Sequence, residues 1–442
     1  MDETNNALER ITPLAITNWR DIRRKFGIKA KNRRGHMYLV GKTGTGKSSL
    51  LGNMIISDME QGNGLALIDP HGDLAEAMLG YVPQERIDDV IYFNPADLDY
   101  PIAFNPLESV EPDKRFLVAS GLISVFKKIW SEFWGPRLEH ILRHSFLTLL
   151  EIPATTLLDV HRLLTDVQFR KGVIAGLTQQ ELKNFWLFEF EKYSAYFRSE
   201  AIAPILNKVG QFLTSLPLRN IVGQHKSKFE MRAVMDEGKI LIANLSKGKI
   251  GEDNCAVLGA LLVTQLQSAA LSRANVPESH RRGFYSYVDE AHNFLTTSFA
   301  DLLSESRKFG LNLTIATQYS AQMDERIRSA VFGNVGTLIA FRVGPEDGET
   351  LAREFSPVFN ESDFMNLPNY QVYLKLMIDG ATSNPFSATT LPLPEKKTGH
   401  LDEIIAGSQA RYGRPREEVE TEMNARTSRE PNQDQNQATL FD

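Results

Sequence analysis

The sequence has 442 residues, of which 42 % are hydrophobic, and its formal net charge is −6. This length allows about two or three domains with a sizeable core, and a charge this close to neutral excludes a uniformly basic nucleic-acid-binding protein. The single cysteine, Cys255, excludes an intrachain disulfide and favours a reducing compartment, where we expect it to be a small buried apolar residue. Neither a secretory signal nor an apolar run of the roughly 20 residues that span a bilayer is evident. We therefore expect a cytoplasmic protein.

The first 35 residues form a locally basic arm. Within it, residues 19–34 carry eight Lys and Arg against one Asp. Trp19, Ile22 and Phe26 have the spacing of one apolar stripe on a helix. Such a segment can dock on the following domain, meet a nucleic acid or touch an anionic membrane, and the sequence leaves all three open.

Eight apolar runs after residue 35 have the character of strands, and several alternate with helical segments. This alternation predicts an α/β fold with a mostly parallel sheet that is covered on both faces. Ligands in such sheets bind at the carboxyl ends of the strands. Polar residues fall at or just past five of these ends: Lys47, Asp69, Asn244, Glu290 and Gln318. The runs are 37–40, 64–68, 89–93, 239–243, 284–288, 312–317, 336–342 and 370–378.

The stretch LVGKTGTGKSSLL contains the Walker A spacing of a glycine, four residues and then Gly-Lys-Ser. A short apolar run precedes it and apolar residues at helical spacing follow it, so a strand, a glycine loop and a helix are expected in that order. Backbone N–H groups and the helix start then face a polyphosphate. We expect ATP binding, with Lys47 reaching the β- and γ-phosphates and Ser48 ligating Mg²⁺. The residues expected to hold the nucleotide are Gly41, Thr43, Gly44, Thr45, Gly46, Lys47, Ser48 and Ser49.

A candidate element near the metal is LIDPHGD, which contains Asp69. Its carboxylate falls just past a strand-like run, at the edge where the nucleotide is expected. Asp69 can equally be a turn residue and the cap of the helix that follows. The sequence leaves both interpretations open.

Residues 112–236 contain no convincing strand and show helical periodicity, which predicts an all-helical domain inserted between strands of the sheet. This segment carries 17 Lys and Arg against 12 Asp and Glu inside an otherwise acidic chain. Its basic excess, with His140 and His144 on one helix, suits contact with a phosphate backbone without reading of sequence. An ordinary helical cap with a solvated face fits equally well. We expect its aromatic residues, among them Trp130, Trp134 and Trp186, to belong to the core.

The stretch FYSYVDEAHNF supplies the acidic residues of a phosphate-hydrolysing site. A buried-strand run ends in Asp289 and Glu290. Asp289 is expected to hold Mg²⁺ through water, and Glu290 to orient the attacking water. The letters DEAH also spell a helicase box, but that helicase class needs a second motor domain, and only about 150 residues remain.

Two further candidates follow this motif. Gln318 ends the strand-like run LNLTIATQ, where an amide can contact the γ-phosphate or its water and report hydrolysis. Arg307 follows Glu290 by 17 residues, on the expected helix between two neighbouring strands. An arginine there can reach a nucleotide bound by an adjacent subunit and stabilise developing charge. A solvated helix face is the alternative for Arg307.

Two later segments have simple interpretations. The run AVLGALLV at 256–263 is too short to span a membrane and is expected to be a core helix. The chain from about residue 422 is polar and lacks a core pattern, which predicts a disordered tail. Its last four residues, TLFD, have the composition of a short docking peptide.

The order of these motifs resembles the FtsK–HerA superfamily of DNA-pumping ATPases. GKTGTGKSSLL, IDPHGD, YVDEAHNF, SRKFG, ATQY and TLIAFRVGPEDGE all take part in this resemblance. DDVIYFNPAD, PIAFNPLE and RYGRPREEVE are also similar to the cytoplasmic ATPase of conjugative type IV coupling proteins. The resemblance spans roughly residues 10–421.

The resemblance implies a RecA-like P-loop NTPase that forms a hexameric ring, with ATP and Mg²⁺ between subunits and DNA in the central channel. Carried over by position, Lys47 and Ser48 bind nucleotide and metal, Asp289 and Glu290 form Walker B, and Gln318 is the sensor. Arg307 takes the place of the arginine finger, and Arg342 can approach the same pocket. The implied parts are a basic arm at 1–35, the ATPase domain at 36–111 and 237–395, the all-α domain at 112–236, and a C-terminal helix and tail at 396–442.

Coupling proteins usually carry an N-terminal membrane anchor, and this sequence shows only the basic arm. We therefore expect either an unanchored branch of the family or a chain that acts with a separate membrane or secretion partner. The leading functional hypothesis is an ATP-driven DNA translocase in conjugative or mobile-element transfer. The alternatives are a HerA-like repair or defence ATPase, a protein-secretion ATPase, and a nucleotide-switched binding module that hydrolyses ATP slowly.

Overall fold

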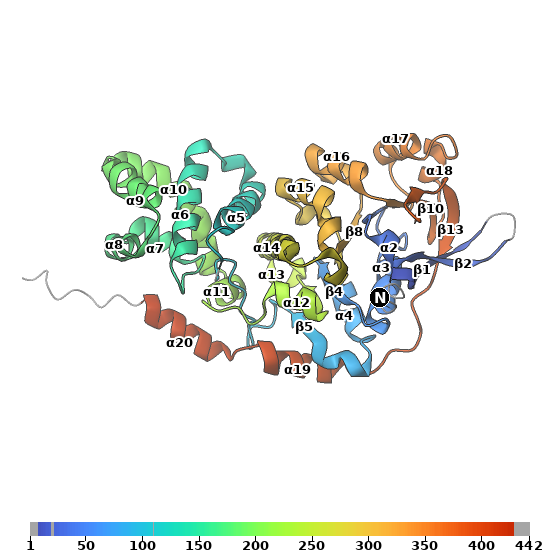
Figure 1. The fold of residues 1–442 in the computed structure, drawn as a ribbon, viewed down its shortest axis with the longest axis horizontal. Helices are drawn as coiled ribbons and strands as arrows, with labels where there is room; N and C mark the ends of the chain where they lie inside the picture. Colours follow the sequence, from blue (N-terminus) through green and yellow to red (C-terminus); the bar gives the residue numbers. More distant parts are fainter. Residues whose placement is uncertain (1–7, 19–21, 109, 428–442) are drawn as a thin grey trace, which may run out of the picture.

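The computed structural model describes residues 8–18, 22–108 and 110–427, and its centre is an eleven-stranded sheet (Figure 1). Seven neighbouring strands are parallel, which confirms the expected α/β fold with a mostly parallel sheet. Each of the eight apolar runs contains a strand, and the last run breaks into two. The parallel strands in spatial order are β9 (Thr337–Ala340), β3 (Met37–Val40), β8 (Leu311–Thr317), β7 (Phe284–Val288), β4 (Gly64–Asp69), β6 (Ile240–Asn244) and β5 (Val90–Phe93).

Antiparallel strands extend the sheet beyond β9, and the outermost two come from the N-terminal arm. A separate two-stranded ribbon lies in the connection between the third and fourth of these strands in the chain. The antiparallel strands from β9 outward are β10 (Gln371–Lys375), β13 (Phe386–Thr390), β1 (Ile11–Thr17) and β2 (Lys25–Lys29), and the ribbon is β11 (Met377–Ile378) with β12 (Ala381–Thr382).

The N-terminal arm forms a β-hairpin, so the expected apolar helix stripe is wrong. Phe26 lies in β2, where its ring centroid is 5.4 Å from that of Phe386 in β13. Ile22 is 53 % exposed, and Trp19 lies outside the described residues. Because β1 pairs with a strand from the far end of the chain, local spacing carried no sign of it.

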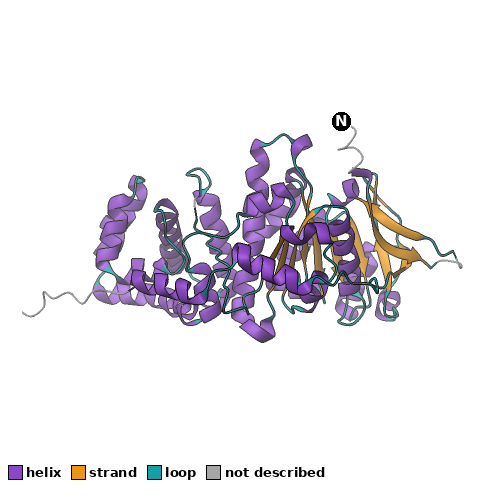
Figure 2. Ribbon diagram, turned by 90° about the horizontal axis from the view of Figure 1, so that it is seen from below, coloured by secondary structure: helices purple, strands orange, loops and turns teal. Residues whose placement is uncertain are grey.

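Helices cover both faces of the sheet (Figure 2). Side chains of each central strand alternate between two apolar cores, so that Leu65 and Leu67 pack with α3 and α4 while Ala66 and Ile68 face α14 and α15. Burial on both faces explains why these strands are continuous apolar runs. These helices are α2 (Ala30–Arg33), α3 (Lys47–Glu60), α4 (Asp73–Leu79), α12 (Met231–Glu237), α13 (Lys247–Ile250), α14 (Glu252–Ser272), α15 (Thr297–Glu305), α16 (Glu325–Asn334), α17 (Pro345–Glu354) and α18 (Glu361–Met365).

The chain between β5 and β6 folds mainly into helices that stand beside the sheet, and no strand occurs among the described residues of 112–236 (Figures 1 and 2). Trp130 and Trp186 are buried there, as expected for core aromatics, whereas Trp134 is half-buried and donates to Glu139 at 2.8 Å. We call this part the helical insert. Its helices are α5 (Arg115–Ile129), α6 (Pro136–Glu151), α7 (Asp159–Thr165), α8 (Val167–Gly176), α9 (Gln180–Asn184), α10 (Ala195–Thr214) and α11 (Leu216–Val222).

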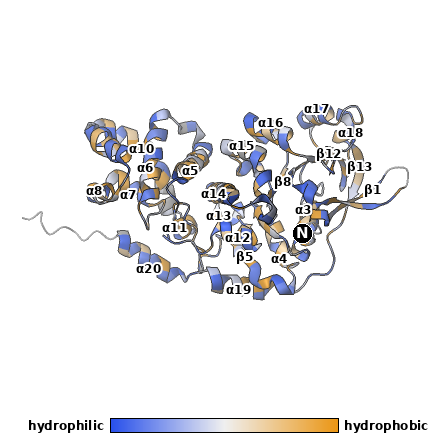
Figure 3. Ribbon diagram, viewed as in Figure 1, coloured by the Kyte–Doolittle hydropathy of each residue, from blue (hydrophilic) through white to orange (hydrophobic). Residues whose placement is uncertain are grey.

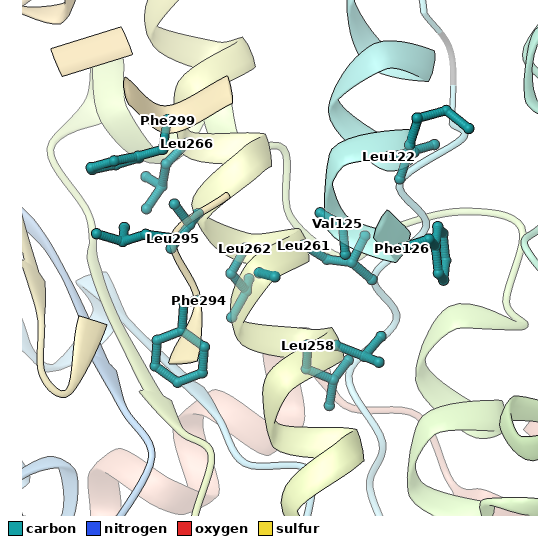
Figure 4. Packing of buried hydrophobic residues seen from close by; sticks show 14 of the residues in the cluster. Leu122, Val125, Phe126, Leu258, Leu261, Leu262, Leu266, Phe294, Leu295 and Phe299 are labelled. Atoms are coloured by element: carbon teal, nitrogen blue, oxygen red, sulfur yellow. The ribbon is translucent and has the colours of Figure 1, made fainter. Parts of the chain in front are cut away.

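Helix α14 is the shared core of the helical insert and the sheet. Among the described residues, Glu252–Asn275 is the stretch long and apolar enough to cross a bilayer, but 67 % of its most apolar window is buried inside the protein. One side of α14 packs on α5 through Leu258 and Leu261, and its other side packs on Leu295 (Figure 4). The expected core helix is therefore confirmed, and Cys255 is buried at its start.

The C-terminal helices α19 (Leu401–Tyr412) and α20 (Arg416–Thr427) run from β5 to the helical insert (Figure 1). Both alternate hydrophilic and hydrophobic residues along their length (Figure 3). Val419 of α20 is fully buried, and Glu422 pairs with His225 at 2.8 Å. The prediction of a disordered tail from about 422 is thus wrong as far as residue 427, because these contacts order the helix. The remainder, with the TLFD peptide, lies outside the described residues.

Candidate nucleotide-binding and catalytic site

The phosphate loop connects the end of β3 to the start of α3, as expected from its spacing. Gly44 and Gly46 have φ angles of +75° and +117°, a region that disfavours other residues. A Cβ atom at Gly46 would lie 2.9 Å from the ring of Tyr370, and one at Gly41 would clash with Phe341. The loop is therefore a shaped cradle, closed on one side by β9 and by the residues before β10.

Lys47 lies inside the curve of this loop. It is 6 % exposed, and its ammonium donates hydrogen bonds to the carbonyl oxygens of Gly41 and, at 3.3 Å, Lys42. Burial lowers the pKa of Lys47, whereas the nearby carboxylates of Glu290 and Asp289 oppose this shift. The lysine, the loop and both acids thus converge at the carboxyl edge of the sheet, where Thr43, Gly44 and Ser48 remain exposed.

Asp289 and Glu290 follow directly after β7. Burial, Glu290 and Asp69 together raise the pKa of Asp289 to about 7. Glu290 adopts a left-handed backbone with φ +43° and ψ +50°, which costs roughly 1 kcal/mol for such a residue. Its Oε2 atom is buried without a hydrogen-bond partner. A buried carboxylate oxygen without a hydrogen-bond partner, on a strained backbone, is typical of a residue that binds a ligand or a water molecule.

These residues fit a nucleotide with Mg²⁺. Among the described residues no three His, Cys, Asp or Glu side chains form a metal cage. Mg²⁺ in phosphate sites rarely has one, because it takes one or two protein oxygens and completes its shell with phosphate oxygens and water. Ser48, exposed at the start of α3, and the buried Asp289 would supply those oxygens.

Asp69 serves as a turn residue and helix cap. Its two carboxylate oxygens accept the N–H groups of His71 at 2.8 Å and Ala75 at 2.9 Å. It also lies close enough to Asp289 to raise the pKa of that group. Asp69 therefore fits both interpretations, the helix cap and the element near the metal, because it caps α4 and adds negative charge beside the expected metal.

Gln318 lies between the two halves of the site. It follows β8, which is hydrogen-bonded to β3 on one side and to β7 on the other. The carbonyl oxygen of Thr317 accepts the N–H of Gly41 at 3.2 Å, so this strand end touches the phosphate loop. Gln318 is partly exposed there, between the loop and Asp289. The structure thus places Gln318 at the strand end where a sensor is expected, and its role as a sensor stays a prediction.

Arg307 lies at the opposite side of the sheet from the phosphate loop, where the parallel strands begin. It is exposed on a short turn before β8, close to His36 at the start of β3, and its charge lowers the pKa of that histidine in addition to the larger effect of burial. The five residue steps from His36 to Gly41 span roughly 16 Å. Arg307 therefore cannot reach the phosphate loop of its own chain. It opens into a pocket of about 650 Å³ lined also by Lys31, Arg34 and Lys308.

Two residues beside the phosphate loop extend the predicted set. The carbonyl oxygen of Arg342 accepts the N–H of Lys42 at 2.8 Å, and its guanidinium donates to Asn369 at 2.9 Å, so this arginine lies at its own chain's loop. Tyr370 was not predicted. Its N–H donates to Thr45 at 2.8 Å, and its ring, 52 % exposed, lies over Gly46. The backbone of Tyr370 is unusual, with a positive φ of +64°. This angle cannot be recognised from the sequence, so the residue could not have been predicted from it.

We expect Tyr370 to supply a platform for the nucleoside of bound ATP. Tyr370→Ala should raise the KM for ATP by about fivefold with kcat little changed, because the ring adds binding that is equal in ground and transition states. Tyr370→Phe keeps the ring and should retain the original KM. Steady-state ATP hydrolysis measures both constants, and an unchanged KM in the alanine variant contradicts this role.

The two histidines proposed for phosphate contact are engaged within the helical insert. His144 stacks on Phe185 with ring centroids 4.0 Å apart, and its Nδ1 bonds to the carbonyl oxygen of His140 at 2.8 Å. The Nε2 atom of His140 forms a hydrogen bond with Glu189 Oε1 at 2.9 Å. Burial lowers the pKa of His144. His144 is therefore engaged in packing within the helical insert, and the proposed contact with a phosphate backbone is left to exposed lysines and arginines.

Comparison with known protein families matches residues 25–354 to the type IV secretion-system coupling protein DNA-binding domain. The match includes the phosphate loop, the helical insert, both acids, Gln318 and Arg307. The chain belongs to this family. Its phosphate loop and acidic pair identify it as an ATPase of the coupling-protein type. No curated protein matches the sequence.

Solved coupling-protein structures share the fold. The plasmid coupling protein TrwB in complex with ADP and Mg²⁺ has 16 % sequence identity and a TM-score of 0.63, over 88 % of this chain and 92 % of that chain. TrwB with a non-hydrolysable GTP analogue has 17 % identity and a TM-score of 0.61, over 88 % and 91 % of the two chains. VirB4 of Thermoanaerobacter pseudethanolicus has 13 % identity and a TM-score of 0.54, over 87 % and 97 %.

Proposed function

We propose that this coupling-family chain is an ATP-hydrolysing DNA translocase that works as a ring, most simply a hexamer, in conjugative or mobile-element transfer. The observation that carries the proposal is that the phosphate loop and the arginine lie at opposite ends of the parallel strands. The cradle, Lys47 and both acids lie at the carboxyl edge, whereas Arg307 is exposed at the amino edge. A second copy that presents its amino edge to the cradle completes the site.

The helical insert is the proposed DNA-contacting part. Its basic excess distinguishes it from the rest of the chain, and contacts through lysine and arginine to phosphates are independent of sequence but sensitive to salt. Family membership supports DNA as the cargo. The proposed location is the cytoplasm, where a membrane or secretion partner would bring the ring to the inner membrane.

The first test is DNA-stimulated ATP hydrolysis. The wild-type chain should hydrolyse ATP faster with DNA, and the stimulation should fall steeply between 50 and 200 mM salt, by about tenfold or more if several phosphates are contacted. Lys47→Ala should abolish turnover with or without DNA, because the γ-phosphate loses its cation. The control is Lys396→Ala, a change of an exposed lysine before α19 and outside the helical insert.

The same assay separates the alternatives. Turnover that DNA never stimulates favours a slow nucleotide switch or a protein-secretion ATPase. Stimulation by duplex ends together with a nuclease partner favours a repair or defence complex. Wild-type turnover in the Lys47→Ala variant contradicts every ATPase hypothesis.

A further inference from the structure

Lys128 connects the helical insert to the loop that carries Glu290. It lies in the last turn of α5, and its ammonium donates to the carbonyl oxygens of His292 at 2.5 Å and Leu295 at 2.7 Å. Those two residues follow Glu290 by two and five positions. A cation of the helical insert thus holds the backbone just beyond the acid that is proposed to orient water.

This contact is costly to make. Lys128 is half-buried. Burial lowers its pKa to about 8 although the charge of Asp324 opposes this shift, and among the described residues no carboxylate forms an ion pair with it. An ammonium taken out of water without an anionic partner destabilises the fold unless hydrogen bonds replace its hydration. The two carbonyl oxygens are that replacement. A neutral side chain would fill the same space at lower cost, so the charge indicates a purpose beyond packing.

The loop held by Lys128 determines the position of Glu290. The N–H and the side-chain amide of Asn293 both donate to the Glu290 carbonyl oxygen at 3.0 Å, which closes a short turn after the left-handed residue. Phe294 and Leu295 then pack against α14 (Figure 4). Glu290 Oε2 accepts no hydrogen bond, and its neighbour His292 Nδ1, which lies on the same loop, is 3.6 Å away. The position of this carboxylate therefore depends on the loop backbone and on what holds it.

The outer side of the same turn of α5 faces solvent. Lys127, the preceding residue, lines an open groove of about 640 Å³ together with Trp134, His140 and Arg143. One helical turn therefore has the catalytic loop on one side and an exposed face of the helical insert on the other. A shift of this turn moves the donor of both loop hydrogen bonds.

We propose that Lys128 is a positioning residue through which the helical insert sets the catalytic carboxylate of Glu290, so that nucleic acid bound to the helical insert changes the rate of ATP hydrolysis. The inference rests on the proposed function. It adds the contact through which DNA bound to the helical insert would change the position of Glu290 and therefore the rate of hydrolysis.

The test compares Lys128→Met with wild type in ATP turnover, with and without single-stranded DNA. Lys128→Met should lower kcat by about tenfold and leave the KM for ATP within about twofold, because water positioning acts in the transition state. Stimulation by DNA should disappear. Lys128→Arg keeps the charge and the donors and should recover part of both effects. Lys396→Met, at an exposed lysine before α19 and outside the helical insert, should match wild type.

Hydrogen–deuterium exchange gives a readout that does not need turnover. In Lys128→Met the amides of 290–296 should exchange faster while those of 41–49 keep their wild-type rates. If Lys128→Met does not fold, Lys128→Gln, which removes the charge but keeps a shorter side-chain amide, decides on the same readouts. Wild-type kcat and DNA stimulation in Lys128→Met, or faster exchange spread over the whole chain, overturn the inference. A wild-type chain that never hydrolyses ATP overturns the proposed function instead, and the local exchange pattern still tests the contact.

Discussion

Replacing Arg307 with alanine is expected to lower ATP turnover by about a thousandfold, the loss typical of a missing arginine finger. Nucleotide binding by the same chain should survive, because the phosphate loop lies at the other edge of the sheet, roughly 16 Å along β3. In the proposed ring the guanidinium serves the nucleotide of a neighbouring copy. Steady-state turnover and equilibrium binding of a fluorescent ATP analogue measure the two halves of this prediction.

A mixing experiment distinguishes action on a neighbour from a structural effect. When Lys47→Ala and Arg307→Ala chains are co-expressed, about a quarter of the subunit boundaries in a random closed ring combine an intact cradle with an intact arginine. Turnover should therefore return to a measurable fraction of wild type, although each variant alone is inactive. Lys308→Ala, an exposed neighbour in the same pocket, is the matched control and should lose far less. Failure of the mixture to recover any activity contradicts the shared site.

Replacing Glu290 with glutamine is the second change with a large expected effect. Turnover should fall by about a thousandfold, within the range for loss of a general base, while ATP binding is retained. The fold should not suffer. Glu290 Oε2 has no hydrogen-bond partner to lose, and the negative charge of Glu290 raises the pKa of the adjacent Asp289. Removing one of two close carboxylate charges relieves repulsion, so thermal stability should equal or exceed that of wild type.

Single-turnover hydrolysis and a thermal melt check both halves of the Glu290 prediction. The control is Glu85→Gln, which removes an exposed carboxylate far along the chain and should change neither quantity. Normal turnover in Glu290→Gln removes Glu290 from the catalytic role. Reduced turnover with a strongly lowered melting temperature assigns the residue to structure instead.

Much of the fold followed from local patterns. Each of the eight apolar runs contains a strand, because strands buried on both faces are continuous apolar runs that can be read directly. The hairpin of the N-terminal arm was not foreseen. Its first strand, β1, pairs with a strand from the other end of the chain, with Ala15 opposite Thr390. Pairing between distant segments leaves no local periodicity, so a helix stripe was the wrong interpretation of Phe26 and its neighbours.

The candidate site shows the same division. The phosphate loop depends on consecutive residues, and a glycine at each positive φ is visible in the sequence. Tyr370 and Lys128 carry no such sign. The ring of Tyr370 meets Gly46 only because β10 and β3 flank β9 in the sheet. Lys128 reads as an ordinary basic residue in the last turn of a helix, a position that suits the helix dipole.

The sequence alone determined which groups are the candidates for chemistry: a phosphate loop, an acidic pair, an amide and an arginine, in an order that resembles DNA-pumping ATPases. It could do so because these groups act through residue type and short spacing. Only the tertiary structure decided that Arg307 and Lys47 lie at opposite edges of one sheet, and that the helical insert touches the loop after Glu290 through Lys128. Both features arise from packing between segments far apart in the chain: the two ends of the parallel strands, and the contact of a half-buried lysine with distant carbonyl oxygens.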